Sequence, residues 1–551
     1  MPVFVRILAA LASISLLGWG LYTIDDVSDA RWLSILGVAW LLLLAATYVQ
    51  LPAMPEIPRS LIRVALVFAT VIAIISVQLI RIQVIQQDEI AFRTAISADG
   101  SDALANPRVV LTPLETARGE IVDRDDEVIA STIQEGDLYY RIWPDPATAY
   151  VAGYFSPFLV ASAGLEATYA DVLAGQTKND PVRRLFNNLL HQPQVGSDLR
   201  LTLDSDLQRA AHEMLGGQDG AVVVVDVDTG DVLVLASNPN YDPNQLFTTS
   251  PSENPMAQSY WDALVGDPNT PLVSRATIGL FTPGSTFKTV TAAIALERGY
   301  AEPDTVYEDD GDIEIDGRVL VEANRPDESR TEWTLREGLM WSLNVVLAQV
   351  GLQIGGDTFW EDAQKFGFGE EIPFALPTSI SQLASSEAFL DSRNAVADTG
   401  FGQGQIQVTP LHMALITAAY ANNGVMMEPR LVDQIIAPSG GVVETLPARE
   451  WLTPISAETA IEVRSMMIDT VASGSAQLAQ VPDYTMGGKT GTAETSGEAP
   501  HSWFIGFIGD TDSEPRYAVA VVLEEGGTGL SGPIGMGRDM LVQAMQQMPS
   551  E

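Results

Sequence analysis

The stretch Phe281-Thr-Pro-Gly-Ser-Thr-Phe-Lys-Thr-Val290 places Ser285 and Lys288 three residues apart at the start of a predicted helix. The Pro-Gly pair ends the preceding structure, and apolar residues then recur at helical spacing until Gly299 supplies a stop. Because residues i and i+3 share one face of a helix, the amine of Lys288 can reach the hydroxyl of Ser285. A serine is a poor nucleophile until a base takes its proton, and a desolvated lysine can be that base. The stretch therefore predicts a nucleophilic serine activated by a lysine.

Lysine is rare in this chain, which makes the pair more informative. Arginine supplies most of the 30 basic residues, and the four lysines are Lys178, Lys288, Lys365 and Lys489. Arginine does not lose its proton in proteins, whereas lysine can, so a lysine kept beside a serine favours chemistry. A Ser-x-x-Lys pair also occurs on solvated helices, and the pair alone leaves both interpretations open.

The composition excludes several classes of protein. The 551 residues carry a net charge of −41 that is spread along the chain, so nucleic acid or an anionic lipid surface is an unfavourable partner. The absence of cysteine excludes disulfides and thiolate metal sites. The histidines lie far apart without metal-ligand spacing, and they are His191, His212, His412 and His501. We therefore expect neither a metal nor another cofactor.

Three apolar stretches open the chain, at about residues 7–24, 32–51 and 64–80, and each is close to the length of a bilayer span. A cleaved signal peptide is the alternative for the first stretch, but two more stretches follow and no clear small-residue cleavage site is present. Arg6 precedes the first stretch, and Arg59 and Arg63 lie between the second and the third. The positive-inside bias therefore predicts a cytoplasmic N-terminus and an extracytoplasmic chain beyond Ile80.

The rest of the chain divides near residue 200. Residues 81–200 have the pattern of a stalk, at 81–92, followed by a β-rich spacer domain in which no catalytic constellation is visible. Residues 201–551 have the pattern of a larger domain of helices and strands. Its expected elements are a helix ending near 215, a hairpin around Asp228-Thr-Gly230, a helical stretch at 333–354 that breaks at 341–344, strands at 502–508 and 517–523, and a last helix at 538–548.

Two more short motifs follow the Ser285 stretch in a fixed order. Ser342-Leu-Asn344 lies in the break of a helical stretch, and Lys489-Thr-Gly-Thr492 leads into a strand-like run. Ser-x-Asn is a weak signal by itself, whereas Lys-Thr-Gly is much less expected in a chain with so few lysines. The three motifs in this order and context are a strong signal for one serine-acyl site.

With these motifs the chain resembles a class B penicillin-binding protein, a membrane-anchored D,D-transpeptidase that cross-links peptidoglycan. The spacer segment contributes Arg118-Gly119 and Gly164-Leu-Glu166, and the opening hairpin at 220–242 also matches. Two features depart from the family: three apolar stretches stand where one span is usual, and Leu343 occupies the middle of Ser-x-Asn. The middle side chain should point away from the pocket, so the second departure leaves the motif intact.

The resemblance implies an α+β fold with N-terminal transmembrane helices, a β-rich non-catalytic pedestal domain, and a transpeptidase domain of the β-lactamase-like type, an antiparallel sheet flanked by helices. It implies Ser285 as nucleophile, Lys288 as base and Ser342 as proton relay. The substrate would be held by Asn344, Lys489, Thr490, Gly491 and Thr492, with the amides of Ser285 and Thr492 as the oxyanion hole. Gly491 would let the substrate backbone lie against its strand.

Several other functions stay open at this stage. A β-lactamase or carboxypeptidase would hand the acyl group to water, a membrane-bound sensor would use acylation by β-lactams as a signal, and a scaffold would carry the motifs without catalysis. About 120 residues between Ile80 and Leu201 are too few for a glycosyltransferase domain. The resemblance therefore implies stem peptides and β-lactams as ligands, a polytopic glycosyltransferase of the SEDS type as partner, and location in the bacterial cytoplasmic membrane.

Overall fold

The structure is a computed structural model of the 551-residue chain, and it describes residues 3–22, 29–47, 56–82, 95–96, 103–104, 114–157, 159, 161–175, 195–248, 254–494, 499–511, 513–528 and 531–547. The chain forms two compact units, residues 1–111 and 112–551. The predicted stalk beyond residue 82, Lys178 and His191 lie outside the described residues.

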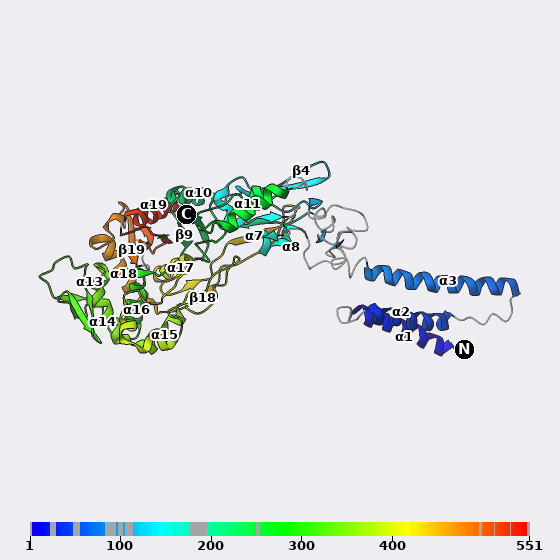
Figure 1. The fold of residues 1–551 in the computed structure, drawn as a ribbon, viewed down its shortest axis with the longest axis horizontal. Helices are drawn as coiled ribbons and strands as arrows, with labels where there is room; N and C mark the ends of the chain where they lie inside the picture. The colour runs from blue at the N-terminus through cyan, green and yellow to red at the C-terminus, as the bar shows by residue number, and fades with distance from the viewer. Residues whose placement is uncertain are drawn as a thin grey trace. The chain divides into compact units, whose positions relative to one another are not determined.

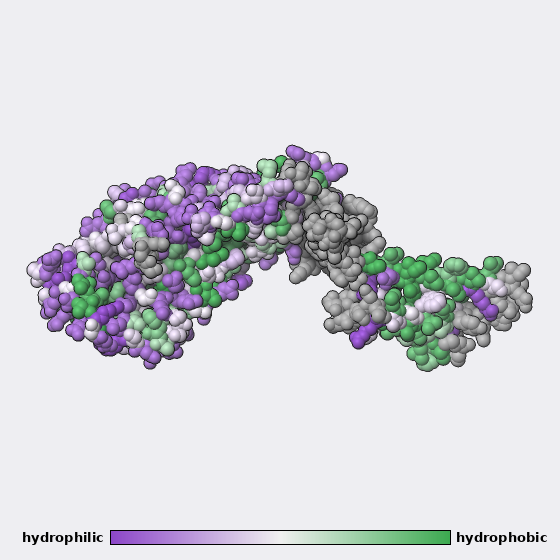
Figure 2. Space-filling view, in the orientation of Figure 1, coloured by the Kyte–Doolittle hydropathy of each residue, from purple (hydrophilic) through white to green (hydrophobic). Residues whose placement is uncertain are grey.

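Among its described residues the N-terminal unit contains three helices, α1 (Val3–Tyr22), α2 (Asp29–Thr47) and α3 (Glu56–Ile80), which cover the three apolar stretches. Their surface is largely hydrophobic in Figure 2, in contrast to the mostly hydrophilic surface of residues 112–551. Polar side chains join the helices: Trp40 Nε1 donates to Thr70 Oγ1 at 3.2 Å, and Ser13 Oγ donates to the carbonyl of Ala39 at 2.9 Å.

The lengths of the apolar segments differ within this unit. Among the described residues one segment, Ser60–Ile80, is long and apolar enough to cross a membrane, whereas Phe4–Gly20 and Arg31–Thr47 are shorter apolar helices. The helices are confirmed as helices, and their passage through a membrane stays a prediction.

A six-stranded sheet begins the second unit, in the order β17-β16-β8-β3-β4-β5. Its central strand β8 pairs in parallel with β3 and antiparallel with β16, so that Leu201 faces Val432. The sheet thus joins the spacer segment to a hairpin from the C-terminal half. Strand β8 spans residue 200, where the sequence predicts the boundary between the two domains, and that boundary stays a prediction. The strands are β3 (Ile121–Val122), β4 (Val128–Glu135), β5 (Leu138–Ile142), β8 (Asp198–Leu201), β16 (Val432–Ile436) and β17 (Val442–Thr445).

A buried ion cluster holds the spacer segment together. Glu166, in α7 (Gly164–Thr168), is fully buried and accepts from Arg118 at 2.6 Å and from Arg141 at 2.5 Å. Burial alone would raise the pKa of the Glu166 carboxyl, but the two guanidinium groups hold it below its usual value. The spacer landmarks Arg118-Gly119 and Gly164-Leu-Glu166 therefore meet in one structural contact.

A five-stranded antiparallel sheet, β10-β9-β21-β20-β19, forms the centre of the larger domain. It is buried on both faces, because alternate valines of β9 belong to two different apolar clusters. Helices α10 and α19 cover one face, and α17 covers the other (Figure 1). The strands are β9 (Gly220–Asp226), β10 (Val232–Asn238), β19 (Tyr484–Ala493), β20 (His501–Asp510) and β21 (Tyr517–Leu523), and the helices are α10 (Ser205–Leu215), α17 (Pro410–Ala421) and α19 (Ser531–Gln547).

The predicted hairpin, strands and closing helix are confirmed, although α19 begins seven residues earlier than expected. The predicted break at 341–344 is also confirmed, because it separates α13 (Leu335–Met340) from α14 (Asn344–Ile354). The other longer elements are α11 (Asn254–Gly266), α12 (Lys288–Glu297), α15 (Gly356–Lys365), α16 (Arg393–Gly400), α18 (Ala457–Ser473), β12 (Asp312–Ile315) and β13 (Arg318–Val321).

Candidate active site

Ser285 lies in the 3-10 turn η5 (Gly284–Phe287), which leads directly into α12. Gly284 has φ of +55°, and a Cβ there would lie 2.4 Å from the carbonyl oxygen of Thr492. Only glycine fits this approach, so Gly284 brings the turn into backbone contact with β19. The hydroxyl of Ser285 is half-exposed and has no hydrogen-bond partner among the described residues. It is therefore available to a substrate.

Lys288 is fully buried at the start of α12, where its amine makes three contacts. Its Nζ donates to the carbonyl oxygen of Ser342 at 2.7 Å and to Oδ1 of Asn344 at 2.7 Å, and it lies 3.2 Å from Oγ of Ser342. All three contacts of the amine thus go to the Ser342 loop, and none goes to Ser285. The helical spacing of Ser285 and Lys288 does not reveal these acceptors.

Lys489 completes the arrangement from the edge strand β19. Its buried Nζ donates to Oγ of Ser342 at 2.9 Å and to the carbonyl oxygen of Thr490 at 3.0 Å. The hydroxyl of Ser342 thus lies between the two lysine amines. Three motifs that are far apart in the sequence meet at this one hydroxyl.

Burial controls the charge of both lysines. It lowers the pKa of Lys288 to about 7, and the carboxylate of Glu322 opposes that shift. Burial also holds the pKa of Lys489 well below its usual value, and the positive charge of Lys288 adds to the effect. Burial is therefore the main cause of the lowered pKa of Lys288. Near neutral pH the pair therefore does not carry two full charges, and a neutral amine is accessible.

Ser342 and Asn344 do not cap the helix that follows them. The N-cap residue of α14 is Leu343, which has no side-chain hydrogen bond to the helix and is fully buried in the core. Its side chain points away from the site, as the resemblance implied. The polar side chains on either side of Leu343 are therefore free for the two lysines.

Gly491 lies in close contact with the nucleophile segment, and its expected role toward the substrate stays a prediction. A Cβ at this position would lie 2.8 Å from the carbonyl oxygen of Pro283 and 2.9 Å from Cγ2 of Thr286. The missing side chain makes room for η5, which packs on β19, and the glycine therefore serves the placement of Ser285.

His501 has a structural position at the rim. Its Nδ1 accepts from the backbone N–H of Glu525 at 3.2 Å, and its ring packs edge-on against Phe281 with centroids 5.5 Å apart. Beside it, Trp503 Nε1 donates to the carbonyl oxygen of Thr282 at 3.0 Å, which ties β20 to the nucleophile segment. These contacts favour the structural interpretation of His501 over a catalytic one.

Glu322 and Asn324 also reach the site, and the sequence analysis did not single them out. Asn324 Nδ2 donates to the carbonyl oxygen of Ser342 at 2.9 Å, and a carboxylate oxygen of Glu322 accepts from the backbone N–H of Val345 at 2.8 Å. No motif marks either residue. Only the fold brings the segment after β13 against the Ser342 loop.

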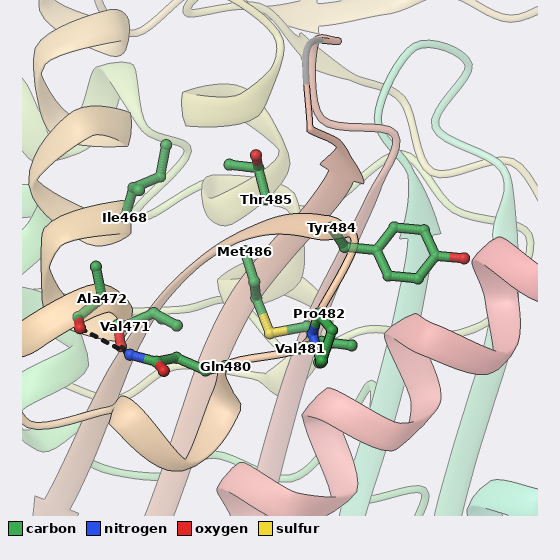
Figure 3. A pocket seen from close by; sticks show the side chains of 9 residues that line it. All are labelled: Ile468, Val471, Ala472, Gln480, Val481, Pro482, Tyr484, Thr485 and Met486. Carbon is green, nitrogen blue, oxygen red and sulfur yellow. Dashed lines mark hydrogen bonds between the residues drawn. The ribbon is translucent and has the colours of Figure 1, made fainter.

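A cavity of about 610 Å³ lies at the other end of β19, against the last turn of α18. Figure 3 shows its lining, where Gln480 Nε2 donates to the carbonyl oxygens of Val471 and Ala472 at 3.0 and 2.7 Å. No charged side chain and none of the motif residues lines it, so it offers none of the groups for acyl transfer. Within the described part of the chain, no group of three or more histidine, aspartate or glutamate residues could hold a metal ion.

Comparison with known proteins identifies two matching families. The penicillin-binding protein transpeptidase domain matches residues 220–535, and the penicillin-binding protein A dimerisation domain matches residues 118–199. The peptidoglycan D,D-transpeptidase PbpA of Mycolicibacterium smegmatis is 30% identical over 471 residues, which cover 82% of this chain and 94% of that protein.

Solved structures give the same result. The penicillin G acyl-enzyme complex of penicillin-binding protein A from M. tuberculosis has a TM-score of 0.71 and 29% identity, and it covers 78% of this chain and 100% of its own. The D,D-transpeptidase domain of a peptidoglycan glycosyltransferase from Eggerthella lenta has a TM-score of 0.68 and 32% identity, and it covers 78% of this chain and 99% of its own.

Proposed function

Because the chain belongs to the penicillin-binding protein transpeptidase family, we propose that it cross-links peptidoglycan as a serine D,D-transpeptidase that β-lactams acylate. The observation that carries this assignment is the hydroxyl of Ser342, which lies 3.2 Å from the amine of Lys288 and 2.9 Å from the amine of Lys489. An unpartnered serine hydroxyl, Ser285, lies one helical turn from the first of these amines. This geometry suits proton transfer between a nucleophile and a leaving amine.

In the first half-reaction, Ser285 Oγ attacks the carbonyl carbon between the two terminal D-alanines of a stem peptide. Neutral Lys288 takes the serine proton, since burial places its pKa near 7. The backbone N–H groups of Ser285 and Thr492 stabilise the oxyanion, and the contact of Gly284 with Thr492 supports this assignment because it brings the two segments together. The tetrahedral intermediate then collapses as the peptide C–N bond breaks.

Ser342 carries the proton to the leaving amine. Its Oγ gives its own proton to the departing D-alanine nitrogen and receives one from Lys288, so the proton count is conserved. Lys489 and the hydroxyls of Thr490 and Thr492 bind the terminal carboxylate of the substrate. A bound carboxylate raises the pKa of Lys489, so the single positive charge shared by the two lysines stays on Lys489. Lys288 is then neutral when the substrate is in place.

In the second half-reaction, an amine of a second stem peptide attacks the acyl-serine ester and loses its proton along the same path. The ester C–O bond breaks, and Ser285 regains its proton. A hydrolase would use water at this step. An amine acceptor is favoured for this chain, because a relative that matches it over 94% of that relative's length is named as a D,D-transpeptidase.

The test uses the full chain in detergent micelles with a fluorescent penicillin and with a pair of synthetic stem peptides. We expect a stable fluorescent adduct, release of D-alanine, and a cross-linked product, all of which are lost in S285A. Rapid penicillin turnover without an adduct would move the assignment to a β-lactamase. A folded protein with neither adduct nor product would move it to a scaffold.

The membrane arrangement belongs to the same proposal. The hydrogen bonds between Trp40 and Thr70 and between Ser13 and Ala39 support a packed bundle of three spans. Arg6 in the first turn of α1, and the arginines near the start of α3, support a cytoplasmic N-terminus. The catalytic unit then lies outside the bacterial cytoplasmic membrane, and a polytopic glycosyltransferase of the SEDS type supplies the strands. Accessibility of single cysteines introduced near residues 25 and 52 to a membrane-impermeant thiol reagent tests this topology: only the former should react in intact cells.

A further inference from the structure

The backbone of Ser342 adopts a conformation that its surroundings must impose. Its φ is +63°, in the left-handed region that a non-glycine residue adopts only under constraint. Its carbonyl oxygen accepts two hydrogen bonds, one from Nζ of Lys288 at 2.7 Å and one from Nδ2 of Asn324 at 2.9 Å. The proton relay is thus fixed jointly by the base and by a residue outside the three motifs.

Glu322 connects this contact to the start of α14. One of its carboxylate oxygens accepts from the backbone N–H groups of the next two residues, both at 2.9 Å, which orients Asn324. The other oxygen accepts from the N–H of Val345 at 2.8 Å. Because the N-cap residue Leu343 has no capping side chain, Glu322 supplies the missing acceptor for the helix that begins at Asn344.

We propose that Glu322 and Asn324 are positioning residues of the active site. Asn324 holds the carbonyl of Ser342, and Glu322 holds both Asn324 and the first turn of α14, so that Ser342 and Asn344 face Lys288. The β12–β13 hairpin delivers both residues and is therefore a part of the catalytic geometry. This inference rests on the proposed function, because it concerns the same acylation reaction.

Charge gives the two residues different signatures. The carboxylate of Glu322 opposes the lowering of the pKa of Lys288 that burial causes, whereas the Asn324 amide carries no charge. Lys489 faces the same amine from β19, and Asp309 and Arg325 lie beside Glu322. E322Q changes none of these groups. A difference in pH midpoint between wild type and E322Q therefore reports the charge of Glu322.

The experiment compares E322Q and N324A with wild type and with E314Q, all as full chains in detergent micelles. Glu314 is an exposed carboxylate on β12 of the same hairpin, which makes E314Q a matched control. The second-order rate constant of acylation by fluorescent penicillin is measured from pH 5 to 9, and thermal unfolding checks that each variant is folded.

We expect N324A to slow acylation about tenfold without moving the midpoint, the factor that one ordinary hydrogen bond supplies. E322Q should slow acylation and also move the midpoint about one pH unit lower, since an opposite charge near Lys288 is lost. E314Q should match wild type. If E322Q fails to fold, N324A decides, because it removes one side-chain contact and no helix cap.

Two results would count against different proposals. Folded variants that acylate like wild type with the same midpoint would overturn the positioning role of Glu322 and Asn324. A folded wild-type protein that is not acylated would instead overturn the proposed function. Because wild type is measured in the same series, the two failures are distinguishable.

Discussion

The charge of Lys288 makes acylation strongly dependent on pH. Lys288 acts as a base only when it is neutral, and burial lowers its pKa to about 7. The neutral form is therefore about 1% of the total at pH 5, half at pH 7 and nearly all at pH 9, because each pH unit below the pKa costs a factor of ten. The acylation rate constant should rise about 100-fold from pH 5 to pH 9, with its midpoint near 7.

Stopped-flow measurements with a fluorescent penicillin give this rate constant at fixed ionic strength. K365A is the matched control, because Lys365 is half-exposed on α15, pairs with Asp362 and makes none of the contacts that join Lys288, Ser342 and Lys489. It should have the wild-type profile. A flat profile, or a rise centred near the usual lysine value of about 10.4, would refute a buried neutral base.

Three further changes test separate parts of the structure. S342A should lower the acylation rate by about 10²- to 10⁴-fold, as expected when a positioned proton-transfer group is lost, and stopped-flow labelling measures it. G284A places a Cβ 2.4 Å from the Thr492 carbonyl, so Ser285 is displaced and labelling should fall about 100-fold, while G535A on α19, where a Cβ meets no atom within 4 Å, controls for the change of residue type. E166Q leaves two buried arginines without their counter-charge, and it should lower the free energy of unfolding by about 3–5 kcal/mol in denaturant titrations; an unchanged midpoint would contradict the buried ion cluster.

The sequence predicted the meeting of the three motifs, because each motif is local and its residue types have few other reasons to occur together. Ser342 lies in the predicted helix break, and Ser285 lies in the turn that leads into the predicted helix. Lys489 lies within β19, whereas the sequence pattern indicated only a segment that leads into later strands. The fold class followed from the family resemblance that these motifs carry. The run of β-branched residues in β9 and the hairpin turn at 228–230 are also local properties.

Long-range contacts were not predictable in the same way. The pairing of Leu201 with Val432 joins segments far apart in the chain, and no local pattern specifies that partner or its register. Asn324 and Glu322 are ordinary polar residues in sequence, and they gain a role only where the fold places them against the Ser342 carbonyl. The three-residue spacing of Ser285 and Lys288 likewise does not reveal that the Lys288 amine donates to the Ser342 carbonyl.

Peptide mapping of the full chain after reaction with penicillin G identifies the residue that carries the acyl group. We expect one covalent adduct per chain, carried by the peptide that contains Ser285, with no adduct in S285A. An adduct on another residue, or complete hydrolysis of penicillin without any adduct, would contradict the assignment of Ser285 as the acylated nucleophile of a transpeptidase.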